Sequence, residues 1–464
     1  MKRLRRLLAL AAALAVAAPA TAEAHGLAGR TDLPVPGWAF AWGACLVLVL
    51  SFVALGTLWP TPRLEREQPR PVLRLPAALD VVAGIVGVAG FVAIVYCGLH
   101  GSQTPLANLA PTSIYVVFWV GIPIVSLVLG DVFRPFNPWR AVARAARAAA
   151  RALGVRQPRA PLSYPERLGL WPAALGLLGF AWLELVLESR DQPSLLAWLA
   201  LAYAAVQLAG MGLFGIAAWS DRGDAFGVYF GLAARLAPLT VRGRELCVRR
   251  PLTGLTEVAP LPGTVAVVCV LIGSTSFDGA ANGLWKQVGP SITRGFAGLG
   301  AGPVGADELA GTFGLLAAVG LIAAAYLIGV RGMTRATGGT HLAGRFVHSM
   351  APIAMAYVVA HYFSLVVFQG QGMEALISDP LGNGADLLGT SGDTINYSVI
   401  STSMIWYVQI AALLAGHVGG LILAHDRALV LFKGRTAVRS QYWMLAVMVG
   451  FTSLGLWLLS TVST

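Results

Sequence analysis

Long apolar stretches recur along the whole chain, and they restrict what it can fold into. Most are about 20 residues long, the length that an α-helix needs to cross about 30 Å of hydrocarbon, and the stretch 264–276 is shorter. Only 12% of the 464 residues are charged, against roughly a quarter in soluble globular domains. Open sheets cannot exist in lipid, and these stretches lack the alternation of barrel strands. The sequence therefore predicts an all-α fold, a polytopic transmembrane helix bundle.

About ten spans are expected, each bounded by loops that carry the charges. They cover 38–59, 79–99, 111–132, 170–188, 195–215, 264–276, 310–330, 350–368, 403–424 and 441–460. With the mature N-terminus outside, the inside loops hold 25 lysines and arginines and the outside segments hold 4. This asymmetry follows the positive-inside rule. It places both mature ends outside and predicts a multi-pass protein of the bacterial plasma membrane.

The N-terminus has the three parts of a secretory signal. A basic region is followed by a short apolar run and by Ala22-Glu23-Ala24, an A-x-A cleavage site. We expect residues 1–24 to be a cleavable signal peptide and 25–464 to be a single transmembrane domain. Cleavage would leave His25 as the first mature residue, where its amine and imidazole could bind copper.

Two loops show a pattern of their own. Asn137 and Pro138 begin a predicted helix over 138–154, with Asn as N-cap and four arginines on one face. We expect this basic amphipathic helix to lie on the anionic lipids of the inner leaflet. The loop 370–401 is rich in glycine and aspartate and has no basic residue. It is interpreted either as an outer lid or as an exposed loop without structure.

The net charge of +11 would favour nucleic acid as a partner of a soluble protein. Here the basic residues lie in loops between apolar spans. Membrane lipid is therefore the expected partner, and nucleic acid is not. A small molecule is the expected substrate. The sequence does not indicate an oligomeric state.

Ionisable residues inside spans are costly and mark function or a structural pair. His361 and His417 are the two most deeply placed histidines, and Asp131 lies at the inner end of the third span. We expect these three as catalytic residues. The glycines around His417 are explained equally well by close helix packing. For His341, His348 and His425, at the inner interface, an ordinary solvated histidine is favoured.

A divalent transition metal is the cofactor that these residue types would suit. The candidate ligands are His361, His417, His425, His25 and His100. His100 and His25 belong to the outer side and the other three to the core or the inner side. No HExxH motif, nucleophile elbow or phosphate loop is present, so no motif names a reaction.

Several segments resemble a family of bacterial polytopic membrane proteins labelled fenitrothion hydrolase. They are HGLAGRTDLPVP from His25, GDVFRPFNPW from Gly130, HYFSL from His361, WYVQ from Trp406, GHVGG from Gly416 and AHDR from Ala424. They extend from the mature N-terminus to the ninth span. The resemblance implies hydrolysis of an organophosphorus triester at a P–O–aryl bond, and it carries over no catalytic residues.

Three functions stay open on the sequence. A hydrolase would use a metal held by histidines and carboxylates to activate water. A transporter would use the same residues as a proton relay or a substrate site. A copper or haem membrane protein would use histidines from facing helices as ligands. Bound metal or a haem absorption band would favour the first or the third, and solute flux the second.

Overall fold

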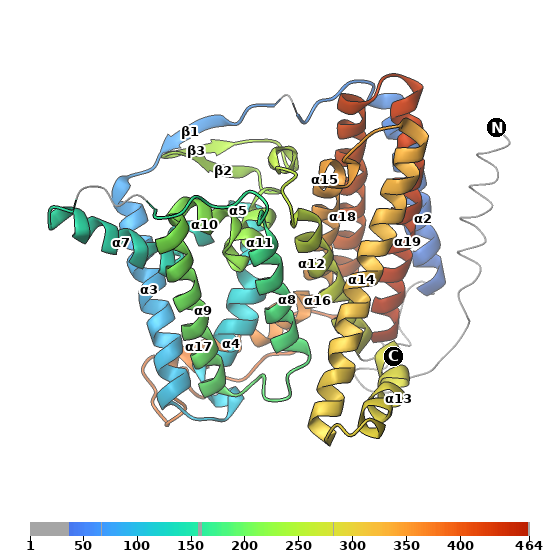
Figure 1. Ribbon diagram of the computed structural model, residues 1–464. Helices are drawn as coiled ribbons and strands as arrows, with labels where there is room; N and C mark the ends of the chain where they lie inside the picture. The colour runs from blue at the N-terminus through green and yellow to red at the C-terminus, as the bar shows by residue number, and fades with distance from the viewer. Residues whose placement is uncertain (1–36, 66, 156–159, 282, 463–464) are drawn as a thin grey trace. The chain divides into compact units, whose positions relative to one another are not determined.

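The ten apolar segments predicted as spans coincide with helices in the computed structural model, which describes residues 37–462 apart from 66, 156–159 and 282 (Figure 1). Among these described residues, seven helices are long and apolar enough to cross a membrane. They are Ala77–His100, Leu109–Leu129, Pro193–Phe214, Thr264–Ala281, Pro303–Thr337, Leu342–Gln369 and Thr402–Leu431. The all-α, multi-pass membrane architecture is therefore confirmed. The exact number of spans and the sides of the two ends stay predictions, and the signal peptide with His25 lies outside the described residues.

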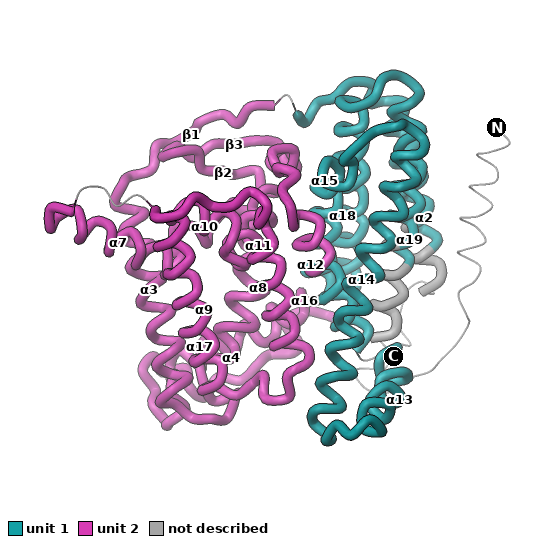
Figure 2. The backbone as a smooth tube through the Cα atoms, viewed as in Figure 1, with its two compact units in different colours: residues 1–66, 271–361, 402–464 teal, residues 67–270, 362–401 magenta. Residues whose placement is uncertain are grey.

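The helices gather into two compact units, coloured teal and magenta in Figure 2. Unit 1 comprises residues 1–66, 271–361 and 402–464, and unit 2 comprises 67–270 and 362–401. Both units are discontinuous in sequence. The boundaries at 270/271 and 361/362 fall within two apolar helices, α12 (Thr264–Ala281) and α16 (Ala351–Gln369). Each of these helices therefore has one part in unit 1 and one part in unit 2.

Unit 1 is built on long helices that lie side by side (Figure 1). Besides its parts of α12 and α16, its elements are α2 (Gly37–Leu58), α13 (Leu284–Gly298), α14 (Pro303–Thr337), α15 (Leu342–Phe346), η4 (Val347–Met350), α18 (Thr402–Leu431) and α19 (Arg435–Val462). Glycines allow the closest approaches. A Cβ on Gly420 of α18 would lie 2.7 Å from the carbonyl oxygen of Ser349, so only glycine fits there. The interpretation of these glycines as helix-packing residues is thus confirmed.

Unit 2 contains shorter helices around an aromatic core. Its helices are α3 (Ala77–His100), η1 (Pro105–Ala107), α4 (Leu109–Thr112), η2 (Ser113–Gly121), α5 (Ile122–Leu129), α6 (Phe133–Phe136), α7 (Pro138–Ala152), α8 (Trp171–Leu185), α9 (Pro193–Phe214), α10 (Ile216–Arg222), α11 (Ala225–Ala234), η3 (Thr253–Glu257) and α17 (Gly372–Ser378). The segment η2 is a π-helix, so the third predicted span is interrupted. The ring of Phe118 packs edge-on against Phe226 and Phe230 of the buried helix α11.

A small antiparallel sheet also belongs to unit 2. Its strands β1 (Arg70–Arg74), β2 (Leu239–Arg242) and β3 (Glu245–Val248) pair in the order β1-β3-β2. Gly243 turns the β2–β3 hairpin with a φ of +62°, a conformation that favours glycine. These strands come from two loops that the sequence predicts to lie on the inner side of the membrane. The charge pattern gave no indication that the loops would pair as strands.

The acidic loop 370–401 has an ordered structure within unit 2. Leu381 accepts a hydrogen bond from the backbone N–H of Ser102 at 2.7 Å, and Pro380 accepts one from Leu109 at 3.2 Å. Asp386 accepts from the hydroxyl of Ser378 and from the N–H of Ser391. The loop is therefore held to the 101–109 segment and is not without structure.

Candidate functional site

Two ionisable side chains meet between apolar helices of unit 1. Nε2 of His361 on α16 lies 2.8 Å from Oδ2 of Asp278 on α12. Their side chains keep 19% and 25% of their surface exposed, so the protein does not fully enclose either of them. Both residues lie in helices that are apolar enough to cross a membrane. Because ionisable residues there are costly, this pair is the strongest candidate site among the described residues.

Close packing of α12 fixes the position of Asp278. A Cβ on Gly273 would lie 2.6 Å from Cα of Val319, so α12 approaches the backbone of α14 directly. Phe277, the residue before Asp278, is buried and packs on Trp285 of α13 with ring centroids 5.1 Å apart. Asp278 is thereby held in place by packing on two neighbouring helices.

The geometry of the pair determines which ring nitrogen of His361 carries the hydrogen. A carboxylate only accepts hydrogen bonds, so Nε2 must carry a hydrogen that it donates to Oδ2. In a neutral ring the lone pair then belongs to Nδ1. A carboxylate in this position orients the ring and favours positive charge on it, which is the role of the partner of a general base.

His417 lies deep in unit 1 and has a different environment. It is 0% exposed, and its Nδ1 donates to the carbonyl oxygen of Leu413 at 2.7 Å. Its ring lies 6.3 Å from that of Tyr357 on α16. A Cβ on Gly416, the preceding residue, would lie 2.6 Å from the carbonyl oxygen of Pro352, so α18 and α16 approach closely there. His417 is thus fully buried within unit 1, and its depth in the membrane stays a prediction.

The interfacial interpretation of His348 and His425 was wrong, because both are only 2% exposed. His425 contacts two carbonyl oxygens at 2.9 Å each, Oε1 of Gln441 through Nδ1 and the backbone of Trp59 through Nε2. The ring of His348 donates a hydrogen bond to the backbone carbonyl oxygen of Arg345. Tertiary contacts from segments far away in sequence cover both rings, and no local pattern reveals such cover.

Asp426 ties the chain after α2 to the end of α18. Its carboxylate accepts from Trp59 Nε1 at 2.9 Å and from the backbone N–H of Arg63 at 2.7 Å and Leu64 at 3.1 Å. It is 0% exposed. Next to it, Arg427 pairs with Glu65 at 2.6 Å. Burial raises the pKa of Glu65, and the nearby charge of Arg427 opposes that rise.

The remaining predicted site residues lie in unit 2 or outside the described residues. Asp131 is half-buried after α5, where its Oδ1 accepts from the N–H of Arg134 at 3.0 Å. Burial raises the pKa of Asp131 although the hydrogen bond and charge of Arg134 lower it. His100 is exposed at the end of α3 and stacks on Tyr96, with centroids 4.6 Å apart. His25 lies outside the part of the chain that the structure describes.

No three His, Cys, Asp or Glu side chains within the described segments lie close enough to hold a metal ion together. His361 and Asp278 form a pair, and His417 and His425 each have their own separate partners. The metal site therefore stays a prediction, and none of these histidines is assigned as a ligand.

The segment Gly130–Trp139, which carries part of the family resemblance, surrounds a buried aspartate of unit 2. Asp224 is 0% exposed and accepts from Asn137 Nδ2 at 2.8 Å, Trp139 Nε1 at 2.7 Å and the hydroxyl of Tyr203 at 2.8 Å. Asn137 also caps α7 by accepting from the N–H of Arg140, as predicted. These contacts give the segment a structural role.

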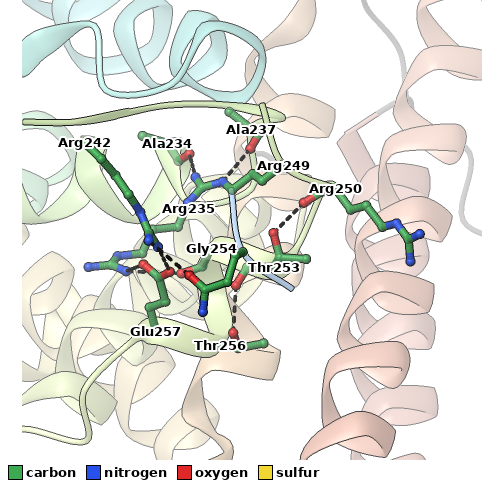
Figure 3. Close-up of polar contacts among 11 residues, drawn as sticks. Ala234, Arg235, Ala237, Arg242, Arg249, Arg250, Thr253, Gly254, Thr256 and Glu257 are labelled. Atoms are coloured by element: carbon green, nitrogen blue, oxygen red, sulfur yellow. Dashed lines mark hydrogen bonds and ion pairs between the residues drawn. The ribbon is translucent and has the colours of Figure 1, made fainter. Parts of the chain in front are cut away.

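Three arginines of the inner loops are engaged within unit 2 itself (Figure 3). Arg249 is 7% exposed and donates to the carbonyl oxygens of Ala234 and Ala237, where α11 ends. A cation is favoured at a helix C-terminus. Arg235 and Arg242 both pair with Glu257. These arginines therefore stabilise the end of α11 and the hairpin, besides adding to the charge of the loops that are predicted to lie inside.

No family model, no curated protein and no solved structure matches the chain.

Proposed function

We propose that the protein is a membrane-embedded hydrolase of organophosphorus esters in which His361 is the general base and Asp278 orients it. The observation that carries the proposal is the 2.8 Å contact between Nε2 and Oδ2 inside apolar helices. A base held by a carboxylate is the arrangement that general-base catalysis requires. We further propose the bacterial plasma membrane as its location.

The reaction can be written with the chain's own groups and water. Nδ1 of His361 takes a proton from a water molecule while the water oxygen forms a bond to phosphorus. The P–O–aryl bond breaks and its electron pair leaves with the aryl oxide. Asp278 stabilises the imidazolium through Nε2, and the proton then returns to solvent. A metal held by further residues stays a prediction, so no step passes through one.

The place of the pair supports a lipophilic substrate. An uncharged aryl triester favours hydrocarbon over water and concentrates in the bilayer. A base between membrane helices would meet it there. The resemblance to fenitrothion hydrolases supports the same bond type.

Fenitrothion hydrolysis by purified protein in nanodiscs tests the proposal, with release of the nitrophenol product followed by absorbance. Asp278→Asn and His361→Gln should each lower the rate by roughly 10²–10⁴-fold, the usual contribution of a general base. His341→Asn and Asp393→Asn are matched controls, because both positions are exposed and far in sequence from the pair. Asparagine also tolerates the positive φ of 54° at His341.

Two outcomes would overturn the proposal. One is a wild-type protein that releases no nitrophenol above protein-free nanodiscs. The other is wild-type turnover in folded Asp278→Asn and His361→Gln proteins. The transporter and the copper or haem protein stay alternatives, and metal analysis with an absorption spectrum of the same samples tests the latter.

A further inference from the structure

The helix α7 runs across two helices of unit 2 instead of along them. Its first turns pack on α3, where a Cβ on Gly84 would lie 3.0 Å from Cβ of Ala141. This contact lies about 10 Å along α3 from its first residue, Ala77. Figure 1 shows the far end of α7 extending away from α3 and α9. Both of these helices are apolar enough to cross a membrane, so a helix that crosses them near the end of α3 lies along the membrane surface.

The two faces of α7 differ in chemistry. Its four arginines follow one another at spacings of four, three and four residues, so they share one face, and the helix has no acidic residue. The opposite face is apolar and exposed, and it comprises Val142, Ala145, Ala149 and Leu153. Val142 keeps 41% of its surface exposed and Leu153 keeps 84%. A basic face opposite an uncovered apolar face is typical of a helix that lies in a lipid surface.

The structure divides the four arginines into two pairs. Arg140 donates to a backbone carbonyl oxygen at 2.9 Å, and Arg144 lies 3.6 Å from a carboxylate oxygen of Asp80 on α3. These two contacts fasten the first half of α7 to unit 2. Arg147 and Arg151 form no ion pair with any described residue, and Nε of Arg147 finds no acceptor there. The described part of the chain therefore leaves the positive charge of the second half of α7 without a counter-charge.

The phosphate of an anionic phospholipid fits this second pair. Arg147 and Arg151 lie one turn or about 6 Å apart along the helix, so the oxygens of one phosphate can accept from both guanidinium groups. The apolar face of the same helix gains by leaving water for acyl chains. A soluble polyanion would contact the arginines and leave that face in water. The choline of a zwitterionic lipid would bring a positive charge close to the arginines, so a headgroup with net negative charge is preferred.

We propose that Arg147 and Arg151 form a binding site for the phosphate of an anionic phospholipid, with the apolar face of α7 on the acyl chains beside it. Binding holds the second half of α7 on the membrane and enriches anionic lipid around unit 2. Salt weakens the attraction of the headgroup but not the apolar contact. The site does not rest on ester hydrolysis, and it is tested without an ester.

Fluorescence quenching at α7 tests the proposal in the full-length protein. Bimane is attached to Ala149→Cys, on the apolar face, in a cysteine-free protein in phosphatidylcholine nanodiscs. A small fraction of the lipid carries a doxyl quencher on an acyl chain, either as phosphatidylglycerol or as phosphatidylcholine. We expect both lipids to quench, with a preference for phosphatidylglycerol of roughly fivefold or more, because each arginine near anionic lipid contributes about that factor. High salt should reduce the preference and leave quenching by phosphatidylcholine unchanged.

Three double variants show which side chains cause the preference. Arg147→Gln/Arg151→Gln should bring the two lipids to nearly equal quenching. Arg147→Lys/Arg151→Lys keeps both charges and should keep most of the preference. Arg331→Gln/Arg335→Gln is the matched control and should keep all of it, because these exposed arginines have the same spacing but lie on α14 in unit 1. Circular dichroism of the same samples checks that each variant is folded.

Four outcomes would overturn the proposal. One is the absence of quenching by either lipid at Ala149→Cys, which would leave the arginines to a soluble acidic partner. Another is equal quenching by the two lipids before any arginine is changed. The others are a full preference in the folded Arg147→Gln/Arg151→Gln protein and an equal loss of preference in the α14 control. The first two need no arginine substitution, so they decide even if the glutamine variant does not fold. Failure of fenitrothion hydrolysis would leave all four unaffected.

Discussion

Replacing Asp224 with leucine is expected to destabilise unit 2 strongly, because three buried donors depend on its carboxylate. Asn137 Nδ2, Trp139 Nε1 and the hydroxyl of Tyr203 all lie within 2.8 Å of its oxygens. Leucine has the same branching and number of side-chain heavy atoms, but it accepts no hydrogen bond. Each donor left unsatisfied in a buried place costs roughly 1–3 kcal/mol. The three together predict a loss of roughly 3–9 kcal/mol in the free energy of unfolding.

A graded series tests where this loss comes from. Asp224→Asn can still present one oxygen to Asn137 and Trp139, which leaves only the Tyr203 hydroxyl hydrogen without an acceptor. Its cost should be roughly 1–3 kcal/mol, well below that of leucine. Trp139→Phe removes one donor and keeps the ring packing, and should likewise cost roughly 1.5–3 kcal/mol.

The free energy of unfolding is measured by titration with sodium dodecyl sulfate in mixed micelles, with tryptophan fluorescence and circular dichroism as signals. Asp393→Asn serves as control, because Asp393 is exposed in the 370–401 loop. The reasoning would be refuted if Asp224→Leu unfolded at the same detergent fraction as this control. Equal losses for leucine and asparagine would also contradict it, since the loss would then come from the charge and not from the number of orphaned donors.

Three further predictions concern the whole chain. Single cysteines at Ala160 and Ser391 in a cysteine-free protein should label from opposite sides with an impermeant thiol reagent, and labelling of both from one side would overturn the topology. Hydrogen bonds from the N–H of Ser391 and from the hydroxyl of Ser378 lower the pKa of Asp386, so its carboxylate stabilises the loop above the unfolded pKa of about 4 and loses that effect as the pH falls. Hydrogen exchange, corrected for intrinsic rates, should show that the amides of residues 378–391 are less protected at low pH. Equal protection at pH 7 and at pH 2 would contradict this. Gly416→Leu should lower the unfolding midpoint by several degrees, because a Cβ there meets the facing backbone, whereas Gly179→Leu should not, because nothing lies within 4 Å of its Cβ position.

The sequence predicts the helices of this protein well, because length and hydropathy decide a membrane helix locally. It misses what depends on distant partners. The predicted span 264–276 ended before Asp278, since an aspartate is costly in lipid, but the helix continues to Ala281. The partner that makes Asp278 tolerable lies 83 positions further along the chain. The short helix α11 was missed for a related reason, as ten apolar residues cannot span a membrane and its burial comes from unit 2.

His361 and His417 were predicted from residue type and position along their spans, whereas Asp278, the partner of His361, was not predicted. His361 and His417 were predicted as deep histidines, and both lie within apolar helices of unit 1. Which side chain each contacts depends on how α12, α16 and α18 turn about their axes. Glycine contacts at single positions, such as Gly416 and Gly420, set those turns. One sequence indicates that such glycines permit close packing, but it does not say which helix packs there.

The buried polar groups of this protein fall into two kinds, and the difference predicts what each substitution changes. Asp224 and Asp426 are each bonded by an indole N–H and by further donors, so their carboxylates are saturated and fixed. Substituting them should change stability, since donors would lose their acceptor. His417 and His348 instead keep a buried nitrogen with no partner among the described residues, so little bonding depends on it. Substituting these two should lower stability less, since no hydrogen bond to Nε2 is lost. Unfolding of variants at Asp224, Asp426, His417 and His348, measured under the same conditions, tests this difference, and equal losses at all four positions would contradict it.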